Sequence, residues 1–257
     1  MNRGGTCCSQ LGEILMRNTR LLLILLFISF LPSGAFSQSL TGVSGLLTIP
    51  TAEMLDDGQM AVGLTFQDEK YLRAFPSRPD NHLLASYITL SYFSFLELAL
   101  RLNRPVDPAA GVVGKVGIGD RLPMIRLRLP RFHPALPAIV IGQHDYSVLS
   151  PAEEASHFSA SYGVLSQEIK LRWKGIELTS FHLGYGVDLV TAHHHEFVGW
   201  FGGTRFKATQ WLMLLLEYDA EYWNGGFRLH LRDAAHVTIG WKQFDSLLAG
   251  FNINFYL

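Results

Sequence analysis

Two groups of side chains in the sequence are of types that carry out chemistry. The first is a run of three histidines, residues 193–195, followed by Glu196. Imidazole and carboxylate groups are suitable ligands for a divalent metal ion. Successive side chains of a strand point to opposite faces, however, so three adjacent residues cannot all reach one ion. The pattern favours a solvated loop, and we expect no metal site and no cofactor.

The second group is Ser180 and His182, which would share one face of a strand, with Glu177 and Asp188 nearby. A serine, a histidine and an orienting polar group form the triad of many hydrolases, and geometry rather than spacing identifies it. No glycine-flanked nucleophile motif surrounds Ser180. We therefore expect no catalytic residue, and we keep a membrane-embedded hydrolase or acyltransferase acting on lipid or glycan as an alternative.

The elements that would position these side chains have the pattern of strands. Residues 168–174 place a charge on every even position and a large apolar side chain on every odd one. Because successive strand side chains alternate in direction, one face is ionic and the other apolar. The same alternation recurs at residues 97–103, 125–129, 212–222, 227–232 and 237–242.

Long alternating segments separated by turn residues are typical of a transmembrane β-barrel, with an outward face that meets lipid and a polar inward face. A soluble β-sandwich also alternates, but its strands are shorter and its polar face holds more Thr and Ser than Arg and Lys. Residues 251–257 alternate up to the last residue, as closure of a barrel requires. Aromatic residues near the segment ends suit interfacial girdles: Tyr92, Phe93, Trp173, Trp200, Trp211, Tyr222, Trp223 and Tyr256.

We therefore predict an all-β fold, an antiparallel transmembrane β-barrel of the outer-membrane type with about 12 strands, spanning residues 60–257. The candidate strands lie near residues 60–67, 83–92, 96–103, 123–129, 137–145, 157–170, 170–187 with a break at Lys174 and Gly175, 196–206, 211–222, 226–232, 236–244 and 247–257.

Composition excludes several other classes. The chain has 21 Lys and Arg against 22 Asp and Glu, and a pI near 6.8. This balance excludes a nucleic-acid protein, which needs a basic surplus to neutralise phosphates. With 17 Phe, 9 Tyr and 5 Trp, the chain carries too much apolar surface to be disordered.

The first 37 residues have the pattern of a secretory signal peptide. Residues 21–31 are almost continuously apolar, Arg17 and Arg20 precede them, and small residues at 35 and 37 suit cleavage after Ser37. A normal basic region would begin at Met16, so residues 1–15 are interpreted as an over-long start. Both cysteines, Cys7 and Cys8, fall in this part, so the mature chain is expected to have no disulfide and no lipid-acceptor cysteine.

The segment before the first strand resembles a known family. Gly45-Leu-Leu-Thr-Ile-Pro50-Thr51-Ala, then Asp57-Gly58 and an alternating strand from Met60, is similar to the opening of the YjbH family of outer-membrane exopolysaccharide proteins, which includes the capsule-associated GfcD proteins. Later blocks follow the same order: residues 119–121 with 125–128, residues 137–142 with Asp145, and residues 216–219 followed by 224–228. The resemblance covers residues 41–257 and corresponds to the N-terminal barrel portion of longer members. It implies a role in secretion or assembly of an extracellular polysaccharide, together with periplasmic export proteins.

The inward faces would be charged. We expect residues 38–59 to lie at the periplasmic mouth or to plug the barrel, with Pro50 and Gly58 fixing turns. Basic rings select anions, so an acidic glycan is one candidate ligand, although charges of both signs in a narrow lumen commonly pair and close it. The expected lining residues are Arg101, Arg126, Arg128, Lys170, Arg172, Lys174, Glu217, Asp219, Arg228 and Arg232, together with Glu97, Glu168, Glu221 and Lys242.

The sequence thus predicts a non-enzymatic barrel in the outer membrane of a Gram-negative bacterium that assists exopolysaccharide or capsule secretion or surface assembly. Its expected partners are outer-membrane lipids, an extracellular polysaccharide and periplasmic export proteins, and not nucleic acid. The alternatives are the barrel hydrolase or acyltransferase and a small-solute porin.

Overall fold

The computed structural model describes residues 38–68, 70, 82–106, 120–133, 135–146, 159–189, 195–232 and 234–257. The expected signal peptide, residues 1–37, lies outside this part. No helix in the described residues is long and apolar enough to cross a membrane.

The described chain forms a closed barrel of twelve antiparallel strands, each paired with its neighbour in sequence, and the last paired with the first. The predicted fold class is therefore confirmed. The strands are β1 (Gln59–Gln67), β2 (His82–Tyr92), β3 (Leu96–Val106), β4 (Asp120–Arg128), β5 (Ala138–His144), β6 (Ala160–Trp173), β7 (Ile176–Val187), β8 (Gly199–Lys207), β9 (Leu212–Tyr218), β10 (Trp223–Arg232), β11 (Ala235–Lys242) and β12 (Ser246–Tyr256).

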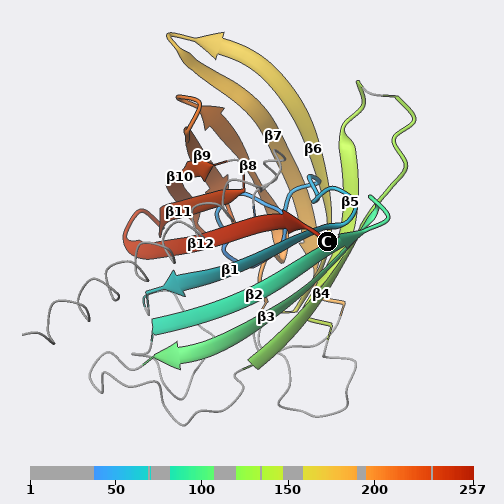
Figure 1. Cartoon of the computed structure of the whole chain (residues 1–257), viewed down its shortest axis with the longest axis vertical. Helices are drawn as coiled ribbons and strands as arrows, with labels where there is room; N and C mark the ends of the chain where they lie inside the picture. The colour runs from blue at the N-terminus through green and yellow to red at the C-terminus, as the bar shows by residue number, and fades with distance from the viewer. Residues whose placement is uncertain are drawn as a thin grey trace, which may run out of the picture.

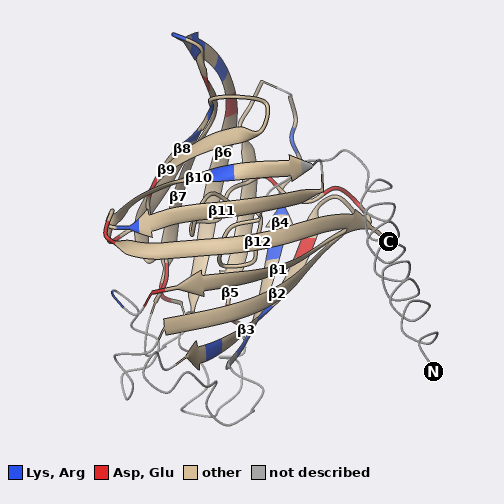
Figure 2. Ribbon diagram, turned by 60° about the vertical axis from the view of Figure 1, so that its left-hand side comes forward, with Lys and Arg blue, Asp and Glu red and all other residues tan. Residues whose placement is uncertain are grey.

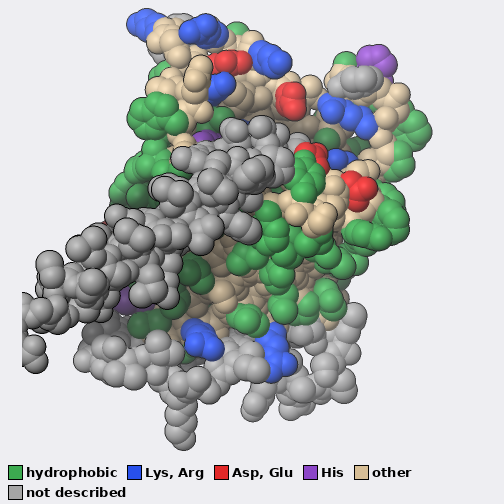
Figure 3. All heavy atoms as spheres, viewed as in Figure 1, with side chains coloured by type: hydrophobic (Ala, Val, Ile, Leu, Met, Phe, Trp, Pro, Cys, Tyr) green, Lys and Arg blue, Asp and Glu red, His purple; other side chains and the backbone are tan. Residues whose placement is uncertain are grey.

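Alternation explains why this sheet closes. Along β3, Glu97, Arg101 and Asn103 are buried inside, whereas Leu98 and Leu100 are exposed on the outer wall. At the closing seam, Leu64 of β1 pairs with Phe251 of β12 on the outside. An apolar outer wall with no free edge can satisfy its backbone within a bilayer. Figure 3 shows hydrophobic side chains across the middle of one face, with charged side chains towards its two ends.

The two ends of the barrel differ. We call the end where β1 begins and β12 finishes the turn end, because the tight turns at residues 93–95 and 174–175 lie there; the opposite end is called the loop end. Exposed aromatic side chains gather near both ends: Tyr92, Phe93, Phe95 and Trp211 near the turn end, and Tyr185, Trp200, Trp223 and Phe244 near the loop end. Such paired girdles mark the two interfaces of a membrane-spanning barrel.

The hairpin of β6 and β7 projects beyond the rest of the wall at the turn end (Figure 1). β5 pairs with β6 only as far as Ser166, so residues 167–173 extend past it. The hairpin turns at Lys174 and Gly175, at the predicted break, and both have positive φ. Lys and Arg residues, blue in the ribbon of Figure 2, lie near its tip.

Candidate functional site

The lumen is occupied by the chain itself. Residues 38–58, which we call the plug, run inside the ring of strands (blue in Figure 1). Leu46, Leu47 and Ile49 are completely buried and share one apolar cluster with Val140, Tyr162 and Phe201 of the wall, among others. The plug has almost no regular structure, apart from the bridges of Gln38 with Ser44 and of Gly45 with Pro50. Its backbone polar groups must therefore find partners on the barrel wall.

The motif residues of the plug form its turns. A Cβ atom at Gly45 would lie 2.2 Å from the carbonyl oxygen of Ile49, so only glycine fits this close approach. Pro50 lies opposite Gly45 in the bridge, and the N–H of Thr51 donates to the Ser44 carbonyl over 3.1 Å. Gly58, with φ +74°, connects the plug to β1.

Glu217 of β9 anchors the centre of the plug. Its carboxylate accepts hydrogen bonds from the backbone N–H groups of Leu47 (2.8 Å), Thr48 (2.9 Å) and Ile49 (3.4 Å). The Thr48 hydroxyl donates a further bond of 2.5 Å. Three consecutive N–H groups converging on one oxygen pair make a nest for an anion, and here a wall carboxylate fills it.

Glu97 of β3 plays the same part on another side of the lumen. It accepts from the N–H and the hydroxyl of Ser44 (3.1 and 2.7 Å) and from the N–H of Leu55 (3.2 Å). The Arg126 guanidinium of β4 donates to the same carboxylate over 2.5 Å, and both side chains are completely buried. A buried carboxylate is thereby paired and hydrogen-bonded, as burial of a charge requires.

Two arginines bind the carbonyl groups of the plug. Arg126 donates to the carbonyls of Thr51 and Glu53. Arg228 of β10 donates to those of Gln38 (2.9 Å) and Leu46 (2.6 Å). The lumenal charges therefore hold the plug: carboxylates take its N–H groups and guanidinium groups take its carbonyls.

A further ion pair joins the plug to β8. Arg205 binds Glu53 through two parallel contacts of 3.0 and 2.6 Å. Burial opposes ionisation of the Glu53 carboxyl, but the charge and hydrogen bond of Arg205, together with His182 and Arg228, hold the pKa of Glu53 below its usual value. The plug is thus attached to the wall by side chains from β3, β4, β8, β9 and β10.

Ser180 and His182 face the lumen and are buried under the plug. His182 lies 2.9 Å from the Ser180 hydroxyl and 2.7 Å from that of Ser166, which accepts the N–H of Ala52. Ser180 is 1% exposed and His182 is fully buried, so neither meets the lipid on the outer wall. Ser166 thereby holds the plug, and His182 links Ser166 to Ser180 beneath it.

Glycines of the wall make room for the plug. Cβ atoms at Gly226 and Gly240 would lie 3.0 and 2.8 Å from Leu47 Cδ2, and a Cβ at Gly203 would lie 2.6 Å from Leu46 Cδ1. The two leucines thus pack directly on strand backbone. Close packing of this kind leaves little tolerance for added volume.

Gly240→Val is expected to lower the free energy of unfolding by about 1–3 kcal/mol, because the added methyl groups must displace Leu47. Urea unfolding of the purified barrel, followed by its heat-modifiable mobility on a gel, measures this change. Gly163→Val is the control, since a Cβ there meets nothing within 4 Å. Leu47→Ala in the Gly240→Val background should recover part of the loss; equal effects of the two valine substitutions would contradict the contact.

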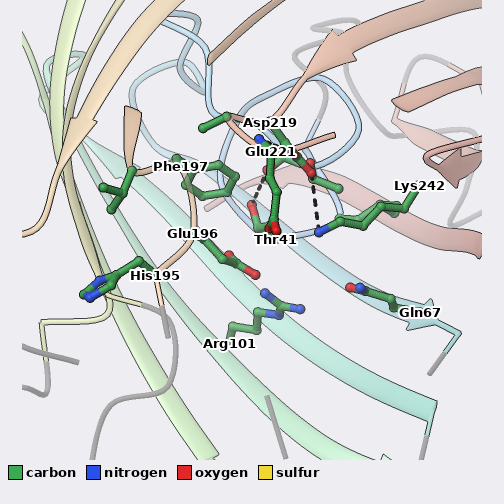
Figure 4. A pocket seen from close by; sticks show the side chains of 13 residues that line it. Thr41, Gln67, Arg101, His195, Glu196, Phe197, Asp219, Glu221 and Lys242 are labelled. Carbon is green, nitrogen blue, oxygen red and sulfur yellow. Dashed lines mark hydrogen bonds and ion pairs between the residues drawn. The ribbon is translucent and has the colours of Figure 1, made fainter. Parts of the chain in front are cut away.

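Above the plug, at the loop end, lies a cavity of about 390 Å³ that we call the vestibule (Figure 4). Its floor includes Leu40, Thr41 and Thr48 of the plug. The rest of its lining comes from the wall and the connections between strands: Gln67, Arg101, His195, Glu196, Phe197, Val198, Asp219, Ala220, Glu221 and Lys242.

The vestibule carries charges of both signs. Lys242 Nζ lies 3.4 Å from Asp219 Oδ2, and Figure 4 shows the Arg101 guanidinium turned towards Glu196. Burial opposes ionisation of Glu196, but its contact with His144 (3.1 Å) and the positive charge of Arg101 keep its pKa below the usual value. Among the described lining residues three carboxylates face two permanent cations, so this mouth is not a purely basic ring.

The predicted lining residues lie in several different places. Arg101 and Asp219 line the vestibule, while Arg126, Glu217 and Arg228 hold the plug. Arg128 lies at the turn end, where it donates to the Ser94 carbonyl over 3.3 Å. Arg232 ends β10, and its side chain is outside the described part.

The expectation that Lys170, Arg172 and Lys174 line the lumen was wrong. All three are exposed on the β6–β7 hairpin, beyond the last residue of β6 that pairs with β5. A bulge between Glu168 and Leu171 shifts the register there, and β5, which begins at Ala138 opposite Ser166, does not extend along this part of the hairpin. Of the histidine run, only His195 is described; its ring contacts Asp188 (3.0 Å) and the Ser159 carbonyl (3.0 Å).

Sequence reasoning missed Glu53, Arg205 and Ser166. Arg205 follows two glycines in a segment with weak alternation, and Ser166 has an ordinary strand environment. Their roles depend on where the plug lies, and the sequence carried no signal for that position. His182 was noticed, but as a possible catalytic group.

Fold and site together define a class, the transmembrane β-barrel of the outer-membrane type whose lumen is filled by its own N-terminal segment.

Among solved structures, the chain is similar to the KdgM porin, with 9% identity, 77% of this chain and 99% of that one covered, and a TM-score of 0.42. It is also similar to the outer membrane protein Omp33 of Acinetobacter baumannii (11% identity, 79% and 99% covered, TM-score 0.40). A third is LpxR from Salmonella typhimurium (7% identity, 77% and 100% covered, TM-score 0.34). The sequence matches no family model and no curated protein. At this level of similarity the neighbours carry no argument about activity.

Proposed function

We propose that this protein is a non-enzymatic, plugged barrel of the Gram-negative outer membrane that assists the secretion or surface assembly of an extracellular polysaccharide. The observation that supports this most is the contact between sequence blocks on which the YjbH and GfcD resemblance rests. Residues 45–52 of the plug are bound by Glu217 and Arg228 from one later block and by Arg126 from another. The resembling residues therefore form one physical unit.

The orientation follows from the connections. Outer-membrane barrels have short turns on the periplasmic side and longer loops outside. The turn end would then face the periplasm, and the β6–β7 hairpin would reach towards export proteins there. The vestibule would open to the cell exterior, where a surface polymer is assembled.

The chemistry of the vestibule suits a hydroxyl-rich ligand. Its carboxylates and cations offer acceptors and donors around one cavity. Phe197 adds an aromatic surface. Because the described lining holds both signs of charge, we favour a neutral or mixed-charge saccharide over the acidic glycan that a basic ring would select.

Both alternatives require the plug to move. A small-solute porin needs the plug to leave the lumen, since the plug is packed against the wall on several sides. A hydrolase based on Ser180 and His182 needs the same movement, because both are buried beneath the plug. The polysaccharide role needs only the vestibule and the two ends.

Deletion of the gene is expected to reduce surface polysaccharide, and wild-type protein to restore it. A vestibule variant, Glu221→Lys with Lys242→Glu, should restore less than half of the output, because it rearranges the charges around the cavity. The measurement is polysaccharide mass per cell, with barrel folding checked by heat-modifiability. Lys174→Glu on the projecting hairpin tests whether the periplasmic end matters separately. Unchanged polysaccharide in the deletion strain would refute the proposal, and ion conductance of the wild-type barrel in planar bilayers would favour the porin.

A further inference from the structure

The outer wall has a groove that runs along β8. Successive outward positions of this strand carry the small residues Gly202 and Thr204. Gly202 lies between Leu183 of β7 and Tyr218 of β9, and Thr204 lies between Phe181 and Leu216 on the same two strands. Large side chains thus flank small ones over two consecutive rows, which leaves a hollow of about 300 Å³.

The groove begins at the aromatic girdle of the loop end. Trp200 and Trp223 border it and are 62% and 56% exposed. Tryptophan concentrates at the level of lipid headgroups, so the groove extends from that level into the hydrocarbon region. It is therefore continuous with the surface that already contacts lipid.

The described lining of the groove is almost entirely apolar. His182 contributes to it from the wall, but its ring points into the lumen and bonds there to Ser166 and Ser180. No Asp, Glu, Lys or Arg is among the residues that line it. The one hydroxyl of the lining is that of Thr204, and its Oγ1 is buried. Most of an occupant held here must therefore be hydrocarbon, because a larger polar group would lose its hydrogen bonds without compensation.

We propose that this groove is a binding site for one fatty acyl chain of a lipid in the outer leaflet. A chain lying between the two rows of side chains contacts the wall on three sides, whereas a chain on a smooth part of the barrel contacts it on one. Dispersion contacts are weak singly but add up along a chain, so the grooved position is preferred over bulk lipid. This site is independent of the vestibule and of the polysaccharide role.

Thr204 is the residue to change. A Cβ atom at Gly202 would lie 2.7 Å from the carbonyl oxygen of His182, so substitution there would strain the backbone. Thr204 already carries a side chain, and Thr204→Phe fills the groove between Phe181 and Leu216 without a backbone change. Thr204→Leu is a smaller second variant. Ser86→Phe is the matched control, because Ser86 is an outward residue of β2, on another part of the wall.

The experiment uses the full barrel in detergent micelles, with phosphatidylethanolamine that carries brominated acyl chains as the probe. Bromine quenches nearby tryptophan fluorescence, and Trp200 and Trp223 border the groove. The wild type and Ser86→Phe should show saturable quenching at low lipid content, followed by a gradual rise. Thr204→Phe should lose the saturable phase or need at least about tenfold more lipid, which corresponds to about 1.4 kcal/mol, and Thr204→Leu should show a smaller shift.

Native mass spectrometry provides a second readout. The wild type should retain one lipid per barrel after mild delipidation, and Thr204→Phe should retain none. Quenching of the wild type that rises linearly from the start, with no retained lipid, would overturn the proposal whatever the variants do. Equal saturable quenching in Thr204→Phe and the wild type would place the lipid elsewhere and would also overturn it.

Discussion

Glu217→Ala is expected to cause one of the two largest losses of stability in the molecule, about 3–5 kcal/mol of the free energy of unfolding. The substitution leaves the N–H groups of Leu47, Thr48 and Ile49 without their acceptor, together with the Thr48 hydroxyl. Each buried donor left without a partner costs about 1–3 kcal/mol. The midpoint of urea unfolding, followed by heat-modifiability, measures the loss.

The same variant tests whether the plug closes the barrel. If water enters the lumen to solvate the N–H groups that have lost their acceptor, Glu217→Ala should conduct ions in planar bilayers. The recordings should then show channel-opening events that the wild type lacks. Glu177→Ala is the control, since that carboxylate lies on the projecting hairpin, away from the plug. A Glu217→Ala barrel with wild-type stability and no change in conductance would show that this carboxylate does not hold the plug.

The second large effect is expected at the buried pair of Glu97 and Arg126. Glu97→Gln and Arg126→Met should each cost about 3–5 kcal/mol, because each leaves the other charge buried without its partner. The double variant should cost less than the sum of the two, by about 1–3 kcal/mol. Part of the cost remains in the double variant, since Arg126 also binds the Thr51 carbonyl and Glu97 also binds Ser44.

An exposed ion pair serves as the control for this cycle. Lys70 and Asp245 are in contact near the loop end, but their side chains are 53% and 51% exposed. Removing either charge should change the free energy of unfolding by less than about 1 kcal/mol. The coupling energy between the two residues should also stay below that value. Strict additivity of Glu97→Gln and Arg126→Met would mean that the two groups act independently, in conflict with the geometry.

The strands could be predicted because alternation is a local property. The even spacing of Leu98, Leu100 and Leu102 identified the outer face of β3, and the Lys174–Gly175 break identified the turn between β6 and β7. The position of a residue along the barrel axis relative to the rest of the wall is not a local property, because it depends on where the neighbouring strands begin and end. For this reason Lys170 and Arg172 were assigned to the lumen, although the neighbouring strand β5 begins only opposite Ser166 and does not reach them.

The site was predictable in its side chains but not in their partners. Charges at Arg126, Glu217 and Arg228 were expected inside, and the opposite charges were expected to pair with each other across the lumen. Glu217 and Arg228 bind mainly the backbone of the plug. Backbone N–H and carbonyl groups are the same in every sequence, so no pattern of residue types reveals which of them a side chain will meet.

The attachment of the plug also constrains the order of assembly. Leu47 meets Glu217 across 170 residues, and Arg228 meets Leu46 across 182. Such distant contacts make folding slow, because a long loop must close before they form. The N-terminal segment emerges first during synthesis, yet its last partners emerge near the end. The β1–β12 pairing closes the wall around these contacts, and we expect the plug to be seated before this last pairing forms.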